Sequence, residues 1–289
     1  MKRFLIFGCG DVGKRLVRRY RKQAHFYALA RSAESAARLR ELGVTPVAGD
    51  LDQPDTLRRL PRVDGVFHFA PPADGVTDTR TRHLLRALAR TGPPERVVYI
   101  STSGVYGDCG GAWVAESRTP APVNARAKRR VDAEIQLRHW GAHHQAAVAI
   151  LRAPGIYAED RLPLERVRRG TPALIAEDDS YTNHIHADDL ARLAWTAMFR
   201  ARPQRIYHAV DNQPLKMGDW FDSCADAFGL PRPPRVTRAE AEGLLSEALL
   251  SFLRESRRLS NRRAIAELRF RYLYPDSESL LTTLNRHAA

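Results

Sequence analysis

Short apolar segments recur along the first half of the chain, each bounded by polar or turn-forming residues. Runs of about four to eight such residues are typical of buried strands. The segments assigned to strands on this basis are Phe4–Phe7, His25–Ala30, Val44–Ala48, Gly65–Ala70, Arg96–Ser101 and Gln145–Leu151.

The segments between these strands favour helices. We expect helices in the segment that opens at Lys14 and at Ala33–Leu42, Pro54–Leu60, Thr77–Arg90 and Asn124–Trp140. Strands that alternate with helices at this spacing form βαβ units, in which helices cover both faces of a parallel sheet. The pattern therefore predicts an α/β fold built on a doubly wound parallel sheet.

A glycine-rich turn follows the first strand and leads directly into the first helix: Gly8-Cys9-Gly10-Asp11-Val12-Gly13. Gly8 allows a tight turn, Gly10 lets the backbone approach a pyrophosphate, and Gly13 allows close packing of helix and strand. The start of the helix offers free N–H groups and a positive dipole end to that phosphate. We therefore predict that these six residues bind a dinucleotide and that the fold is of the Rossmann type.

The alternation of strands and helices ends after Tyr157, and the rest of the chain is richer in proline and charge. We predict a Rossmann domain over residues 1–157, with 183–212 returning to it. Residues 158–182 and 213–289 are predicted to form a small C-terminal lobe that shapes a substrate pocket. The clearest helices expected in this part are Leu162–Arg169 and Met217–Phe228.

The composition is strongly basic, with a formal net charge of +13. Basic proteins can bind nucleic acid through its phosphates. Here the cations, nearly all arginine, are spread along the chain without a basic tail or interleaved aromatic residues. This distribution is typical of a compositional bias, so we do not expect nucleic acid as a partner.

Cys9, Cys109 and Cys224 are far apart and form no C-x-x-C pair, so no disulfide framework or zinc motif is indicated. No apolar run is as long as a membrane span, and the one after the initial Met-Lys-Arg is too short for a signal peptide. We therefore expect a cytoplasmic protein without membrane association.

The segment that ends the fifth strand, Tyr99-Ile100-Ser101-Thr102-Ser103-Gly104-Val105-Tyr106-Gly107, resembles the short-chain dehydrogenase/reductase superfamily. The resemblance is to its extended or atypical branch of nucleotide-sugar epimerases and dehydratases. Later segments resemble the same branch in the same order, and the match runs from about Lys2 to Leu268. These segments are Leu151–Tyr157, His184–Leu190, Tyr207–Val210 and Ser260-Asn261.

The resemblance implies an active site made of a Ser or Thr, a Tyr, and a Lys four residues after the Tyr. The phenol exchanges a proton with the substrate while hydride moves to or from nicotinamide, and the ammonium lowers the phenol's pKa. This chain has Thr102 and Lys128 at two of these positions, but Asn124 stands where the Tyr is expected. A carboxamide cannot exchange a proton at useful pH, so that acid/base is absent.

Two interpretations of the remaining residues stay open. In the first, Thr102 orients the substrate, Lys128 binds the nicotinamide ribose, and Tyr106 or water handles the proton. In the second, Thr102 satisfies the end of its strand and Lys128 is one more cation on a basic helix. Tyr106 and Tyr157 are then wall residues with satisfied hydroxyls.

The end of the second strand bears on the choice of cofactor. An acidic residue there would favour NAD, whereas Arg accommodates the extra phosphate of NADP. The segment contains Arg31 and Ser32 but no acid, and Lys14 or Arg15 would add positive charge. We therefore expect NADP, with NAD as the alternative.

The resemblance assigns three further residues to the cofactor. Asp50 and Leu51 match a pair that contacts adenine, and Ala70 lies where the family has small residues near the ribose. Alternatively, Asp50 stabilises a turn before Pro54.

His184 and His186 precede Asp188 and Asp189. Alternate residues of a strand share a face, so a metal site is one interpretation. The resemblance instead gives this segment a structural role, and we expect no metal. Arg152 either meets a substrate phosphate or pairs with an acid.

Together these features predict an NAD(P)-binding oxidoreductase or epimerase-like protein that acts on a polar small molecule such as a sugar nucleotide. The alternative is a non-catalytic NADP-binding sensor or regulatory protein, which Asn124 would explain directly. A homodimer formed through the long helix Asn124–Trp140 is a further expectation, although the many charges of this helix weigh against it.

Overall fold

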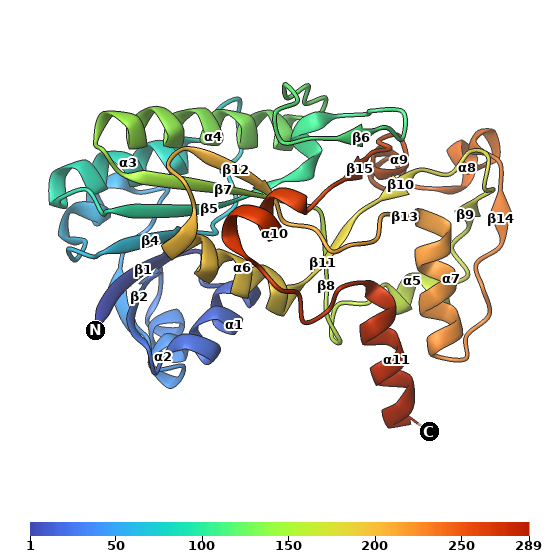
Figure 1. The fold of residues 1–289 in the computed structure, drawn as a ribbon, viewed down its shortest axis with the longest axis horizontal. Helices are drawn as coiled ribbons and strands as arrows, with labels where there is room; N and C mark the ends of the chain where they lie inside the picture. The colour runs from blue at the N-terminus through green and yellow to red at the C-terminus, as the bar shows by residue number, and fades with distance from the viewer. Residues whose placement is uncertain (289) are drawn as a thin grey trace.

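A seven-stranded parallel sheet forms the centre of the computed structural model, which describes residues 1–288 and the side chains of all of these except 248 and 286–288 (Figure 1). The strand order is β12-β7-β5-β4-β1-β2-β3. The strands are β1 (Lys2–Phe7), β2 (Ala24–Ala30), β3 (Thr45–Ala48), β4 (Gly65–His68), β5 (Arg96–Thr102), β7 (Ala147–Ala153) and β12 (Arg205–His208).

Helices cover both faces of this sheet, because successive side chains of a buried strand point to opposite sides. Phe4 and Ile6 of β1 pack in a core with helices on one face, and Leu5 and Phe7 pack in a second core on the other. The first face carries α1 (Asp11–Tyr20), α2 (Ala33–Glu41), α6 (Ala187–Arg200) and α10 (Arg262–Leu268); the second carries α3 (Thr79–Thr91) and α4 (Ala125–His143). The predicted doubly wound fold is confirmed.

The predicted elements of the first half occur, with shifted ends. The segment at Pro54–Arg59 is a 3-10 helix, η1. The strand expected over Gly65–Ala70 ends at His68, because Phe69 and Ala70 turn and donate both their N–H groups to the carbonyl of Phe7. The long helix α4 begins after Asn124, which caps it, and continues to His143.

The strand order reverses direction between β1 and β4, which is where ligands bind in open sheets of this kind. The chain after β1 enters the glycine-rich turn, and the chain after β4 passes beside it. Both segments lie at the carboxyl edge of the sheet, as in a dinucleotide-binding fold.

A smaller lobe lies beyond the carboxyl ends of β5 and β7 (Figure 1). β8 (Gly155–Tyr157) pairs with β11 (His184–His186) at its base, and β12 returns the chain to the main sheet. The lobe and its connections contain η2 (Ser103–Tyr106), β6 (Trp113–Val114), α5 (Leu164–Arg168), β9 (Ala173–Leu174), β10 (Tyr181–Thr182), β13 (Leu215–Lys216), α7 (Met217–Ala227), β14 (Arg235–Val236), α8 (Arg238–Leu244), α9 (Glu247–Leu253), β15 (Arg258–Leu259) and α11 (Ser277–Ala288). Among the described residues, none of the helices combines the length and hydropathy needed to cross a bilayer.

Candidate cofactor and active site

The glycine-rich turn has the backbone geometry that an approaching phosphate requires. Gly8 has a φ of 82°, and a Cβ there would lie 2.5 Å from the backbone nitrogen of Ala70. Gly10 caps α1 without any side-chain hydrogen bond, and a Cβ at Gly10 would meet no described heavy atom within 4 Å. The turn is therefore tightly packed beneath Gly8 and open above Gly10, at the positive end of a helix.

The other residues of the turn pack around this opening. A Cβ at Gly13 would lie 3.3 Å from the Cys9 Sγ, so helix and turn are in close contact there. Burial raises the pKa of the Cys9 thiol to about 11. A thiol that stays protonated fits the role of a small packing residue better than a redox role.

Asp11 places a carboxylate in the first turn of the helix, and arginines neutralise it. Its oxygens accept hydrogen bonds from Arg15 Nε at 3.0 Å and Arg161 Nη1 at 3.1 Å. Arg15 also donates to Asp188 and Asp160, so its guanidinium is shared among three carboxylates. Arg15 is therefore held in an ion-pair cluster, which leaves it poorly placed to bind an additional phosphate.

At the end of β2, Arg31 is exposed and Ser32 caps α2 through a reciprocal bond with Ser35. Asp50 accepts a hydrogen bond from the backbone of Asp52 at 3.0 Å, as expected of a turn-stabilising residue. The Leu51 side chain is buried in the second core.

Sequence reasoning missed a bidentate ion pair beside these residues. Arg80 of α3 donates to both oxygens of Asp52, at 2.8 and 2.6 Å, and to the carbonyl of Pro71 at 3.1 Å. The Arg80 guanidinium, with help from the charge of Arg31, lowers the pKa of the Asp52 carboxyl. The pair ties together the loops that follow β3 and β4, on the two sides of the switch point.

A cavity of about 640 Å³ lies at the carboxyl ends of β5 and β7, between the sheet and the smaller lobe. Four arginines line it, and Glu255 is the only carboxylate among its described lining residues. The positive excess suits an anionic ligand. The residues that line the cavity include Thr102, Gly104, Asn124, Arg126, Arg130, Arg161, Tyr181, His184, Trp220, Glu255 and Arg257.

Thr102 and Asn124 both line this cavity, at the end of β5 and the start of α4. The hydroxyl of Thr102 accepts a hydrogen bond from Gly104 N at 3.2 Å, so it also satisfies the end of its strand. The side-chain oxygen Oδ1 of Asn124 accepts a hydrogen bond from Ala127 N at 2.8 Å, which makes Asn124 the N-cap of the helix.

Lys128 is exposed and is not among the cavity-lining residues. The cations of α4 that line the cavity are Arg126 and Arg130, and Arg130 donates to the carbonyl of Ile100 at 2.8 Å and the hydroxyl of Tyr99 at 3.0 Å. Helical periodicity explains the difference, because positions 126, 127 and 130 share a face and 128 is rotated about 100° or more from each of them. The ribose role of Lys128 stays a prediction.

Tyr106 does not line the cavity. The residue is 1% exposed, its hydroxyl is 2.6 Å from His208 Nε2, and burial raises its pKa to about 12. Tyr157 is equally buried, and burial raises the pKa of its phenol as well. Both phenols are thus enclosed away from the cavity, and their assignment as wall residues or as proton donors stays a prediction.

Arg152 pairs with an acid, as one interpretation expected. Its guanidinium donates to both oxygens of Glu134 at 3.1 and 2.6 Å, and both side chains are buried. Glu134 also accepts from the Ser101 hydroxyl at 2.6 Å. The other interpretation, a contact between Arg152 and a substrate phosphate, is wrong because Arg152 is enclosed.

His184 and His186 pack against Tyr157, with ring centroids at 6.2 and 5.3 Å. Burial lowers the pKa of His184 to about 4. Asp189 accepts hydrogen bonds from the backbone of Leu273 and Tyr274, a structural role. No cluster of three or more metal-binding side chains occurs in the part of the chain that the structure describes.

Three cavity residues that sequence reasoning missed come from distant segments: Arg161, Glu255 and Arg257. Glu255 accepts from Arg257 Nη1 at 2.8 Å and lies 3.4 Å from Asn124 Nδ2. No motif marks these residues, since 131 positions separate Asn124 from Glu255. Only the folding of the lobe onto the sheet brings them together.

The model of the NAD dependent epimerase/dehydratase family matches residues 4–209, more than half of the chain, so the protein belongs to this family. A UDP-glucose 4-epimerase of Azospirillum brasilense is 28% identical over 180 residues, which cover 57% of this chain and 47% of that protein. The predicted family resemblance is confirmed.

Solved structures agree with this assignment. A conserved protein of unknown function from Silicibacter pomeroyi is 28% identical, with a TM-score of 0.84 and 99% of each chain covered. MoeE5, solved in complex with UDP-glucose and NAD, shares the fold at 20% identity, with a TM-score of 0.72 and 99% of each chain covered. The protein is thus an NAD(P)-binding, epimerase-like member of its family, and the sensor alternative is not favoured.

Proposed function

We propose that this protein oxidises and re-reduces a hydroxyl-bearing carbon of a nucleotide-linked sugar, with NADP as its preferred dinucleotide. The observation that supports an anionic substrate is the cavity with four arginines and one carboxylate beside the Rossmann switch point. A diphosphate satisfies such a set of cations, and the sugar then extends toward Thr102.

The open space above Gly10 fits a dinucleotide pyrophosphate. In the proposal, the backbone of residues 8–13 holds the pyrophosphate, Asp50 and Leu51 contact adenine, and Ala70 lies near the ribose. Arg31 and Ser32 bind the additional phosphate of NADP, and Lys128 contacts the nicotinamide ribose. The bound dinucleotide supplies the hydride chemistry, and Thr102 orients the substrate hydroxyl.

The test is to measure the binding of NAD, NADP and UDP-glucose to the full chain by calorimetry. We expect NADP to bind more tightly than NAD, and Arg31→Ala to weaken NADP about tenfold while leaving NAD unchanged. Tighter binding of NAD would contradict the cofactor preference. Failure to bind either dinucleotide would overturn the proposed function.

Two further expectations stay predictions: a cytoplasmic location and a homodimer through α4. The exposed positions of α4 include Arg126, Lys128 and Arg138. An isologous interface would bring these like charges together, so a dimer through this face requires acidic residues opposite them.

A further inference from the structure

We propose that Glu255, in the segment between α9 and β15, is the catalytic residue that transfers the substrate proton in place of the absent phenol. The inference rests on the proposed function, because it concerns the same site. It is carried by the juxtaposition of this carboxylate with Thr102 and with Asn124, the position at which the family's Tyr is missing.

Glu255 occupies the corner of the cavity where the phenol is expected. One carboxylate oxygen lies 3.4 Å from Asn124 Nδ2. The other lies 3.9 Å from the point where a Cβ on Gly104 would stand, and Thr102 Oγ1 is 3.5 Å from that same point. The carboxylate and the hydroxyl thus both lie within 4 Å of one point on the cavity wall, and a substrate hydroxyl placed there would have both groups beside it.

Two donors hold this carboxylate in place. Arg257 Nη1 donates to Glu255 Oε2 at 2.8 Å and to the carbonyl of Gly107 at 2.8 Å, which ties the pair to the segment after β5. The two side chains are only 14% and 11% exposed. Asn124 therefore gains a function on this view, since its amide orients the carboxylate that replaces the phenol.

The other titratable groups near the site are poorly suited to the same task. Tyr106 and Tyr157 are enclosed. His184 is buried against Trp220, with ring centroids 4.8 Å apart. Tyr181 lines the cavity, but its ring packs under the guanidinium of Arg258, 4.6 Å from the ring centroid, and against Gly111.

In the proposed step, the substrate carbon is oxidised and hydride passes to the oxidised dinucleotide. The O–H bond of the substrate hydroxyl breaks, and its proton passes to the Glu255 carboxylate. The C–H bond on the same carbon breaks, its electron pair leaves as hydride to the nicotinamide, and a carbonyl forms. On the return, Glu255 gives its proton back to the carbonyl oxygen while Thr102 holds that oxygen.

The test compares Glu255→Gln and Glu255→Asp in the full chain, with UDP-glucose and the dinucleotide that the wild type binds. We expect Glu255→Gln to keep both affinities within about threefold at pH 7 but to lower formation of reduced nicotinamide by about 10²–10⁴-fold. Glu255→Asp should recover part of the rate.

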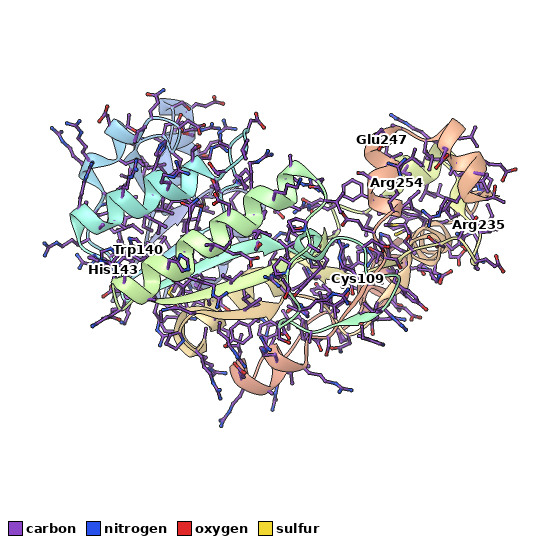
Figure 2. All side chains as sticks on the ribbon, turned by 90° about the horizontal axis from the view of Figure 1, so that it is seen from above. Cys109, Trp140, His143, Arg235, Glu247 and Arg254 are labelled. Carbon is purple, nitrogen blue, oxygen red and sulfur yellow. The ribbon has the colours of Figure 1, made fainter. Side chains whose placement is uncertain are left out.

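A matched control is Glu247→Gln on α9. Glu247 pairs with Arg254 in an exposed contact, and Figure 2 shows both at the outer edge of the smaller lobe. This variant should leave both affinities and the rate of formation of reduced nicotinamide unchanged.

The outcomes separate the two proposals. If the wild type is active and Glu255→Gln retains its rate, the role of Glu255 is overturned and the proposed function stands. The same holds if the rate is lost only when Tyr181→Phe is added to Glu255→Gln. A Glu255→Gln variant that loses its affinity for UDP-glucose as strongly as its rate would also overturn it, because the carboxylate would then serve binding alone. Failure of the wild type to bind any dinucleotide would instead remove the proposed function and this inference with it.

Discussion

At the scale of single residues, Gly8 and Gly10 serve different purposes although they are two positions apart. Gly8→Ala places a Cβ 2.5 Å from the backbone of Ala70 in a backbone conformation that L-residues rarely adopt. We expect a loss of at least about 2 kcal/mol in unfolding free energy, measured by chemical denaturation.

Gly10→Ala is the matched variant, because its backbone is ordinary and the space around it is open. We expect it to lose at most about 1 kcal/mol of stability. Its Cβ occupies the space assigned to the pyrophosphate, so dinucleotide affinity should fall about tenfold or more. Equal losses of unfolding free energy in the two variants would contradict the difference between a crowded Gly8 and an open Gly10.

At the scale of elements, one buried ion pair fixes α4 against the strands that end at the cavity. Glu134 of α4 bonds Ser101 of β5 and Arg152 of β7, each one residue before a cavity-lining position. The contact sets the position of Asn124 relative to Thr102. The opposite end of the helix, marked by Trp140 and His143 in Figure 2, lies away from the smaller lobe.

We expect Glu134→Gln to lower the unfolding free energy by about 3–5 kcal/mol, because it leaves the Arg152 cation buried without a counter-charge. The control is Glu165→Gln on α5, which removes an exposed ion pair with Arg169, the residue that follows this helix. This variant should lower the unfolding free energy by less than about 1 kcal/mol. Denaturation curves for the three proteins measure both values. A small effect of Glu134→Gln would mean that water reaches the pair.

At the scale of the whole molecule, buried neutral histidines make global stability depend on pH. Burial lowers the pKa of His68 to about 3, whereas an unfolded chain takes up this proton near pH 6.5. Between these values only the unfolded state binds the proton. The unfolding free energy therefore falls with decreasing pH, by roughly 1.4 kcal/mol per pH unit for each such histidine.

His68→Gln removes one of these protons. At pH 6 the unfolding free energy of His68→Gln is expected to lie below that of the wild type. As the pH falls from 6 to 4, this difference should shrink by about 2 kcal/mol, because only the wild type has a buried imidazole that must stay neutral in the folded state. His139, which is exposed on α4, provides the control variant His139→Gln. Parallel pH profiles for the wild type and His68→Gln would contradict the argument.

Local pattern in the chain was enough to predict the βαβ order, the glycine-rich turn and the family. Each of these depends on residues close in sequence, whose spacing fixes strand alternation, helix periodicity and turn geometry. Arg152 illustrates the limit, since the sequence is compatible with two partners and only the packing of α4 against β7 decides between them.

The composition of the candidate site depended on the tertiary structure. The orientation of α4 puts Arg126 and Arg130 rather than Lys128 on the cavity face, the contact with His208 of the edge strand β12 holds the Tyr106 hydroxyl away from the cavity, and the lobe carries Glu255 to Asn124. These outcomes are decided by long-range burial and hydrogen bonding, which leave no periodic trace in the sequence. The chain by itself thus specified the scaffold and its glycine-rich turn, while the tertiary structure decided which side chains line the cavity.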